Sequence, residues 1–144
     1  MIHMRHFCYN KDILSKATTK QKQSVLSPDL ASKKVLQIAS NQKALDLKIF
    51  NVQGHCAYAD FFVVMSATST THAQGLADAI LKQFPKGNQH LEGYKNGQWI
   101  LLDVGDVVVH IFLEEAREHY NFDKLWGHVP YENIRDSVRL ATHQ

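Results

Sequence analysis

The stretch WILLDVGDVVVHIF, residues 99–112, decides the fold of this chain. It is an almost unbroken apolar run, interrupted by Gly105 between Asp103 and Asp106. An aspartate in a turn accepts hydrogen bonds from nearby backbone N–H groups, and glycine reaches turn conformations that other residues avoid. The pattern predicts two strands that reverse direction at residues 104–106, where the aspartates need no catalytic role.

A second reversal precedes this stretch. Residues 90–94 (HLEGY) and 98–103 (QWILLD) are joined by Lys95-Asn96-Gly97. Asn-Gly between two apolar runs is a strong signal for a hairpin. We therefore expect residues 90–113 to form an antiparallel meander of three strands.

Three segments have the features of helices. Ser27-Pro28-Asp29 has the residue types of a helix start, with Ser27 as the cap, and apolar residues at helical spacing continue this helix over 28–44. Residues 68–84 carry an apolar stripe that suits a helix on a sheet, capped by Thr68 or Ser69. Residues 114–127 read as a shorter helix that stops at a glycine.

Two more strands complete the predicted fold. Residues 45–52 approximately alternate between apolar and polar, and residues 61–67 are uniformly apolar, as in a central strand covered on both faces. The predicted fold is α/β (α+β): a five-stranded mixed sheet with two main packed helices and a short third.

The length of 144 residues favours a single domain. Residues 1–27 carry a charge of +4 and lack a regular apolar pattern, so we expect a basic, disordered extension. The folded domain is expected over residues 28–128, with a net charge that is slightly acidic, and residues 129–144 are expected to be a tail with at most a weak helix.

No window approaches the roughly 18–20 apolar residues that a bilayer-spanning helix needs. A cytoplasmic protein is the simplest expectation. The extension is short of acids and rich in Ser and Thr, as organelle transit peptides are, so an organelle is the alternative.

His110 alternates with its neighbours to lie on the same strand face as Val108 and Phe112. A single histidine on an apolar strand is usually buried and hydrogen-bonded, and we expect that here. Trp99 and Leu101 share a face of the preceding strand. Trp99 is core if helices cover both faces of the sheet, and an exposed interface anchor if they cover one; spacing alone leaves both open.

An alternative interpretation is a magnesium-dependent nucleotidyltransferase that uses Asp60, Asp103 and Asp106 as metal ligands. Its phosphate cradle would be SATSTTH, residues 66–72, which has no glycine, lysine or arginine. The GxSxG, P-loop, GxGxxG and HExxH motifs are absent. We therefore predict no enzyme activity, catalytic residue, metal or cofactor.

Residues from about 28 to 127 resemble the Iojap-like family, the ribosomal silencing factors. The matching segments, in order, are KALDLKIFNV (43–52), ADFFVV (59–64), SATSTTH (66–72), EGYKNGQWILLDVGDVVVHIF (92–112) and FDKLWG (122–127). This resemblance implies a nucleotidyltransferase-like topology without the active site.

The resemblance also implies a partner and a mechanism. Family members bind the large ribosomal subunit at its fourteenth protein, L14, and block association with the small subunit, which lowers translation when nutrients are scarce. The resemblance implies that the block is steric. It also implies contact through the sheet surface, which favours Trp99 as an interface residue. The residues expected to contact the partner are Trp99, Leu101 and Val104, with Tyr94 and Lys95 at the rim.

Further residues match the family signature and are expected to hold the meander and the last helix together, for example through a pair between Arg117 and a turn aspartate. They are Asp60, Asp103, Asp106, His110, Glu115, Arg117, Tyr120 and Trp126. Ala67 and Thr71 depart from the family pattern of glycine and arginine, and Thr71 puts contact with ribosomal RNA at that helix start in doubt. An apolar sheet face would also allow two copies to associate as a homodimer, in competition with the ribosome.

Overall fold

The computed structural model describes residues 29–85 and 89–134, so the predicted extension and most of the predicted tail, for which a weak helix was expected, lie outside the described residues. The elements in chain order are α3 (Leu30–Asn41), β1 (Leu45–Asn51), β2 (Phe61–Ala67), α4 (Thr70–Lys82), β3 (Gln89–Glu92), β4 (Trp99–Val104), β5 (Val107–Leu113), α5 (Glu114–Tyr120), α6 (Phe122–Leu125) and β6 (Tyr131–Asn133). None of these helices combines the length and the apolar character needed to cross a membrane.

The described residues form a sheet of six strands in the order β3-β4-β5-β2-β1-β6, one strand more than predicted. β2 and β5 are parallel and every other neighbouring pair is antiparallel, so the sheet is mixed as expected. The extra strand, β6, comes from the segment that was predicted to be a tail. Its three residues are exposed and show no apolar alternation, but buried Val129 and Ile134 flank it and fix it against β1.

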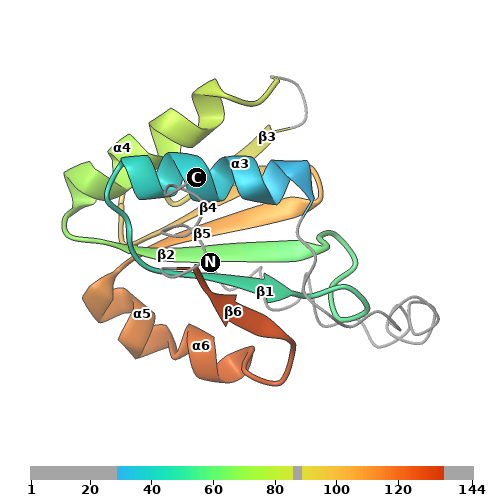
Figure 1. The fold of residues 1–144 in the computed structure, drawn as a ribbon. Coiled ribbons are helices and arrows are strands. Elements are labelled where there is room, and N and C mark those ends of the chain that lie inside the picture. Colours follow the sequence, from blue (N-terminus) through green and yellow to red (C-terminus); the bar gives the residue numbers. More distant parts are fainter. Residues whose placement is uncertain (1–28, 86–88, 135–144) are drawn as a thin grey trace.

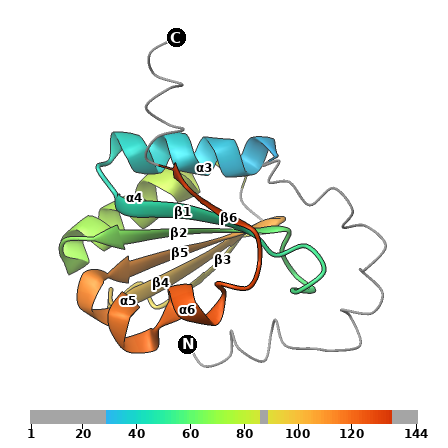
Figure 2. The same ribbon diagram turned by 60° about the horizontal axis from the view of Figure 1, so that its bottom comes forward.

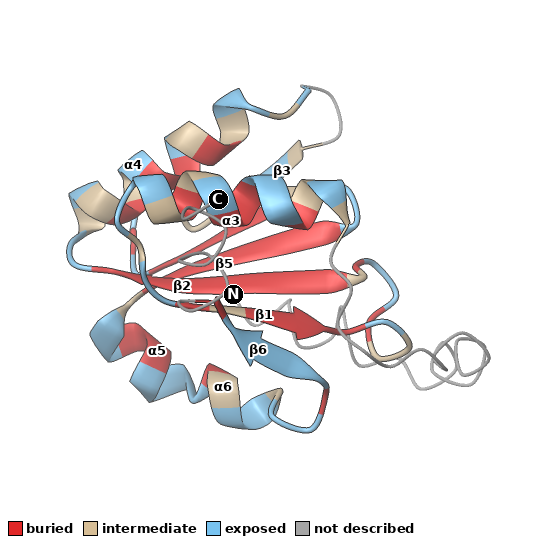
Figure 3. Ribbon diagram, viewed as in Figure 1, coloured by how far each residue is buried: buried red, intermediate tan, exposed pale blue. Residues whose placement is uncertain are grey.

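Helices cover both faces of the sheet. α3 and α4 lie on one face, and α5 and α6 lie on the other (Figures 1 and 2). All seven residues of β2 are buried, which confirms the prediction of a central strand covered on both sides (Figure 3). Along β5, Val107, Val109 and Ile111 enter the core under α3 and α4, whereas Val108 and Phe112 enter the core under α5 and α6.

The helix starts follow their capping residues. Asp29, not Ser27, caps α3, because its carboxylate accepts a hydrogen bond from the Ser32 backbone N–H at 2.9 Å. Ser69 caps α4 by accepting from the His72 N–H at 3.1 Å, as predicted.

The β3–β4 connection is longer than the predicted short turn and spans residues 93–98. Gly93 and Gly97 both have positive φ, and the Gly97 N–H donates to the Gly93 carbonyl at 2.9 Å. A Cβ at position 97 would collide with the side chain of Thr70 on α4. Gly97 therefore serves both the turn and the close approach of this loop to the helix.

The third predicted helix, over 114–127, is in fact two short helices. Asn121 adopts the left-handed conformation, with φ 55° and ψ 39°, and separates α5 from α6. Asparagine tolerates this conformation better than other residues with a Cβ. The break turns the chain so that Phe122 enters the core beneath α5 and α6.

Substitutions at Asn121 test this break. Asn121→Val should lower the free energy of unfolding by about 1–2 kcal/mol, because a β-branched residue is strained in the left-handed region. Asn121→Gly should be nearly neutral, since glycine reaches that region freely. Urea unfolding followed by circular dichroism measures both; equal losses for the two variants would contradict a left-handed residue at this position.

Candidate protein-binding surface

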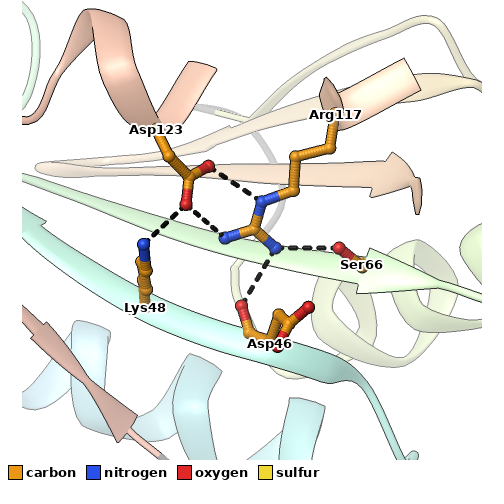
Figure 4. Close-up of polar contacts among 5 residues, drawn as sticks. All are labelled: Asp46, Lys48, Ser66, Arg117 and Asp123. Atoms are coloured by element: carbon orange, nitrogen blue, oxygen red, sulfur yellow. Dashed lines mark hydrogen bonds and ion pairs between the residues drawn. The ribbon is translucent and has the colours of Figure 1, made fainter. Parts of the chain in front are cut away.

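A buried arginine joins the two short helices to the sheet (Figure 4). Arg117 of α5 forms a two-pronged ion pair with Asp123 of α6, with N···O distances of 2.9 and 3.1 Å. The guanidinium also donates to the backbone carbonyl of Asp46 in β1 at 3.0 Å and to the hydroxyl of Ser66 in β2 at 2.8 Å. Lys48 donates to Asp123 from β1 at 2.7 Å. We call these five residues the Arg117 network.

The backbone conformation of β1 at Asp46 allows one contact of this network. Asp46 has a positive φ of 46°, where the register of β1 against β2 shifts between Leu45 and Lys48. At this irregularity the Asp46 carbonyl accepts from Arg117. The expected pair between Arg117 and a turn aspartate is therefore wrong, because the carboxylate partner is Asp123.

The neighbours of Asp123 stabilise the ionised form of its carboxyl group. Burial alone would raise the pKa of this carboxyl, but the hydrogen bonds from Arg117 and Lys48 outweigh burial and lower it. Asp123 consequently stays ionised in the folded protein to a more acidic pH than in the unfolded chain.

An aromatic cluster lies beside the Arg117 network. The Trp99 ring stacks on Phe112 with a centroid separation of 4.8 Å and contacts Tyr120 at the same separation. Its indole N–H donates to Nδ1 of His110 at 3.1 Å. The His110 ring in turn packs against Phe122, with centroids 4.6 Å apart.

His110 is fully buried, and its hydrogen bond with Trp99 confirms the prediction of a hydrogen-bonded core residue. Burial, with a smaller effect from the Arg117 charge, lowers its pKa to about 3. The imidazole is therefore neutral near pH 7. Because Nδ1 accepts from Trp99, the ring proton lies on Nε2, which has no hydrogen-bond partner among the described residues.

The structure does not gather the five expected contact residues on one open face. Trp99 and Leu101 are 8% and 6% exposed and belong to the core under α5 and α6. The interpretation of Trp99 as an exposed residue on a bare sheet face is therefore wrong. Val104 lies in the opposite core, and Tyr94 donates from its hydroxyl to Asp78 of α4 at 3.0 Å. Lys95 is exposed in the loop between β3 and β4.

Part of this sheet face is nevertheless accessible at the β3 edge. The register places His90 opposite Asp103 and Glu92 opposite Leu101, so these side chains point to the side of α5 and α6. His90 is exposed, and Glu92 and Asp103 are half-buried. We call these four residues the β3–β4 face. Along β4, Leu101 is followed on the same side by Trp99, which Tyr120 covers; the Tyr120 side chain is 45% exposed.

The three aspartates of the nucleotidyltransferase alternative lie near the β4–β5 turn and make different contacts there. Asp103 accepts a backbone hydrogen bond from Gly105, as expected for a turn aspartate, and burial raises the pKa of its carboxyl. The Asp60 N–H donates to the Asp106 carbonyl at 2.7 Å, which is a backbone contact. Within residues 29–85 and 89–134, no three His, Cys, Asp or Glu side chains are grouped so that they could hold a metal ion.

Residues 66–72, the phosphate cradle of that alternative, contain side chains with structural roles. Ser66 binds Arg117, Ser69 caps α4, and His72 links the Thr68 N–H to the Gln42 carbonyl through its two ring nitrogens. The side chains of Ser66, Ser69 and His72 therefore have structural roles.

Two other signature residues differ in their surroundings. Glu115 is exposed in the first turn of α5, where a negative charge favours the helix N-terminus. Trp126 is half-buried and packs edge-on against Phe62, with centroids 4.9 Å apart.

Most of the Arg117 network was not predicted from the sequence. Asp123, Lys48, Ser66 and the Asp46 carbonyl are distant in sequence or carry ordinary surface residue types. The available signal was the pair of charged residues in FDKLWG, since a buried arginine needs a carboxylate with matching geometry.

A family model and related proteins agree on one family for this chain. A family model described as "Ribosomal silencing factor during starvation" matches residues 26–144. "Ribosomal silencing factor RsfS" of Halalkalibacterium halodurans is 35% identical over 108 residues, which cover 70% of this chain and 92% of that protein. "Protein Iojap-related, mitochondrial" of Arabidopsis thaliana is 34% identical over 112 residues, covering 72% of this chain and 60% of that protein. A crystal structure from Chromobacterium violaceum has a TM-score of 0.64 and 26% identity, and covers 71% of this chain and 88% of that one.

The depressed pKa of Asp123 predicts a specific acid dependence. The stabilising contribution of this carboxylate is complete above the ordinary carboxyl pKa of 3.8 and is lost as pH falls below that value towards the pKa of the folded state. Asp123→Asn should be less stable than the wild type near pH 7, and this deficit should shrink on acidification.

Urea unfolding at a series of pH values measures this difference. Glu118→Gln is the matched control, because Glu118 is exposed on α5 and its side chain takes no part in the Arg117 network, so this variant should keep the acid dependence of the wild type. A constant deficit for Asp123→Asn down to the most acidic pH at which the protein folds would contradict the assignment.

Proposed function

We propose, on the premise that this chain belongs to the ribosomal silencing factor family, that it binds the large ribosomal subunit through L14 and blocks association with the small subunit. The observation that carries the proposal is the family match, which spans both helical layers and the whole described sheet. The family consists of ribosome-binding factors rather than enzymes. The proposed effect is repression of translation by occupation of a surface, without a chemical step. The nucleotidyltransferase-like topology stays a prediction.

The β3–β4 face with Tyr120 is our candidate for the contact with L14. It combines an exposed aromatic residue with polar groups, as protein interfaces do. Its carboxylates, Glu92 and Asp103, together with the exposed Glu114, Glu115 and Glu118 of α5, give this side of the molecule acidic character. Such a surface suits a partner rich in lysine and arginine, which proteins that bind RNA need for their phosphate contacts.

Two buried members of the predicted contact set, Trp99 and Leu101, lie beneath this surface. The Trp99 ring packs against Tyr120. Leu101 lies on β4 between its register partners, Glu92 of β3 and His110 of β5. A pre-ordered surface loses less conformational entropy on binding. Direct contact with the partner stays a prediction for the five residues Trp99, Leu101, Val104, Tyr94 and Lys95. Lys95 is the most exposed of them and is therefore the best placed to contact ribosomal RNA.

We place the protein in a compartment that contains ribosomes of bacterial type. Bacterial and mitochondrial proteins are both among its relatives, so the bacterial cytoplasm and an organelle are the two settings that fit.

Sedimentation through sucrose gradients tests the proposal. The full chain should co-sediment with isolated large subunits and not with small subunits, and it should reduce the yield of joined ribosomes when added before the small subunit. Equal binding to both subunits, or normal joining at saturating protein, would overturn the proposal.

Tyr120→Ala tests the candidate surface. The variant should bind large subunits about tenfold or more weakly, as expected when an exposed aromatic anchor is removed. Tyr58→Ala is the matched control, because Tyr58 is also exposed and precedes β2 at the end of the sheet opposite Tyr120. Unchanged affinity for Tyr120→Ala, with melting curves showing both variants folded, would remove this surface from the interface.

A further inference from the structure

Two histidines from separate segments lie close together at the end of the sheet where β1 ends and β2 begins. His55 is half-buried in the connection between β1 and β2, and His128 is exposed between α6 and β6. Their imidazole rings have centroids 5.4 Å apart and planes at 78° to each other. Histidine is the commonest metal ligand among the side chains, so this pair is a candidate metal site.

The surrounding backbone and one aromatic ring hold the two histidines near each other. The Asn51 N–H donates to the Pro130 carbonyl at 2.8 Å, which joins the end of β1 to the segment that precedes β6. The Trp126 ring stacks on His128, with centroids 5.8 Å apart and planes at 19°. A site whose ligands are already close together loses less conformational entropy when it is filled.

We infer that His55 and His128 together bind one divalent transition-metal ion, for which Zn²⁺ is the reference ion. A bond of about 2.0–2.1 Å between Zn²⁺ and a histidine nitrogen places the metal roughly 3 Å from the centroid of the imidazole ring. The centroids of two tetrahedral ligands are then roughly 5 Å apart. The observed separation of 5.4 Å fits this spacing.

The site is open, because two protein ligands leave the remaining coordination positions to water. Structural zinc sites have four protein ligands, so binding here is weaker and more readily reversible. A two-ligand site agrees with the lack of any group of three His, Cys, Asp or Glu ligands among the described residues. Sequence spacing did not predict the pair, because the two histidines are distant in the chain and form no metal-binding motif.

The His55 ring is in the form that metal binding requires. Burial, and to a smaller extent the charge of His128, lowers the pKa of His55, so its ring is neutral near pH 7. A neutral imidazole keeps a lone pair on one nitrogen. Imidazole nitrogen suits zinc, copper and nickel, whereas Mg²⁺ is bound through oxygen ligands. The site should therefore bind Zn²⁺ in preference to Mg²⁺.

Within residues 29–85 and 89–134, His55 and His128 are the one pair of histidine rings in contact. Both ring nitrogens of His72 form hydrogen bonds with backbone groups, and His110 is fully buried. His90 is the strongest competitor, because it is exposed and its Nε2 contacts a carboxylate oxygen of Glu92 at 2.8 Å. A substitution at His90 is therefore the matched control.

Isothermal titration calorimetry of the full chain with ZnCl₂ tests the inference without any ribosomal component. His55→Gln and His128→Gln should each weaken the zinc site about tenfold or more, because a single imidazole loses the advantage of two linked ligands. His90→Gln should bind zinc as tightly as the wild type, and MgCl₂ should give no binding heat at this site. His128→Gln is the decisive variant, since His128 is exposed and its substitution leaves the core intact.

Thermal unfolding followed by circular dichroism gives a second measurement and shows that each variant is folded. Zn²⁺ should raise the Tm of the wild type and of His90→Gln, because a ligand that binds the folded state stabilises it. The double variant His55→Gln/His128→Gln should show a smaller rise. The inference is overturned if the wild type shows no saturable zinc binding, if the double variant binds zinc and gains stability as the wild type does, or if His90→Gln is the variant that loses the site.

Discussion

The ion pair between Arg117 and Asp123 is the constraint on which the second helical layer depends. α5 and α6 are too short to be stable alone, since isolated helices below about 12–15 residues are marginal in water. The guanidinium ties them to β1 and β2 through the Asp46 carbonyl and Ser66. Removal of Asp123 would leave the buried guanidinium of Arg117 without a carboxylate partner, whereas Asp123 would keep Lys48 if Arg117 were removed. The position of the two helices over the sheet therefore depends most on the Arg117 side chain.

Local signals predicted most of the elements. The all-apolar run of β2, the reversal at residues 103–106 before β5 and the cap of α4 each depend on residues close in sequence, and the structure has them where they were expected, with Ser69 as the cap of the two candidates. His110 was predicted as core from alternation alone, because a strand repeats every two residues whatever packs on it. The same reasoning failed for β6, whose three exposed residues carry no pattern and are fixed by their flanking residues.

The candidate site was less predictable because it depends on contacts between distant segments. The Arg117 guanidinium reaches a carbonyl 71 residues away, and any residue type can supply a carbonyl. The position of Trp99 depended on which face the short helices would cover, and that depends on the left-handed turn at Asn121. Amino-acid spacing could therefore place Trp99 on a face but could not say whether that face was open.

The proposed action, occupation of a ribosomal surface, needs a protein whose shape stays constant under the conditions in which it works. The aromatic cluster around His110 satisfies this requirement, because the imidazole has a pKa of about 3 and does not change charge between pH 5 and 8. Asp123 likewise stays ionised over that range. The groups that hold the surface are thus insensitive to ordinary changes of pH, so control through the amount of available protein or through a competing partner fits this architecture better than control by protonation of its core.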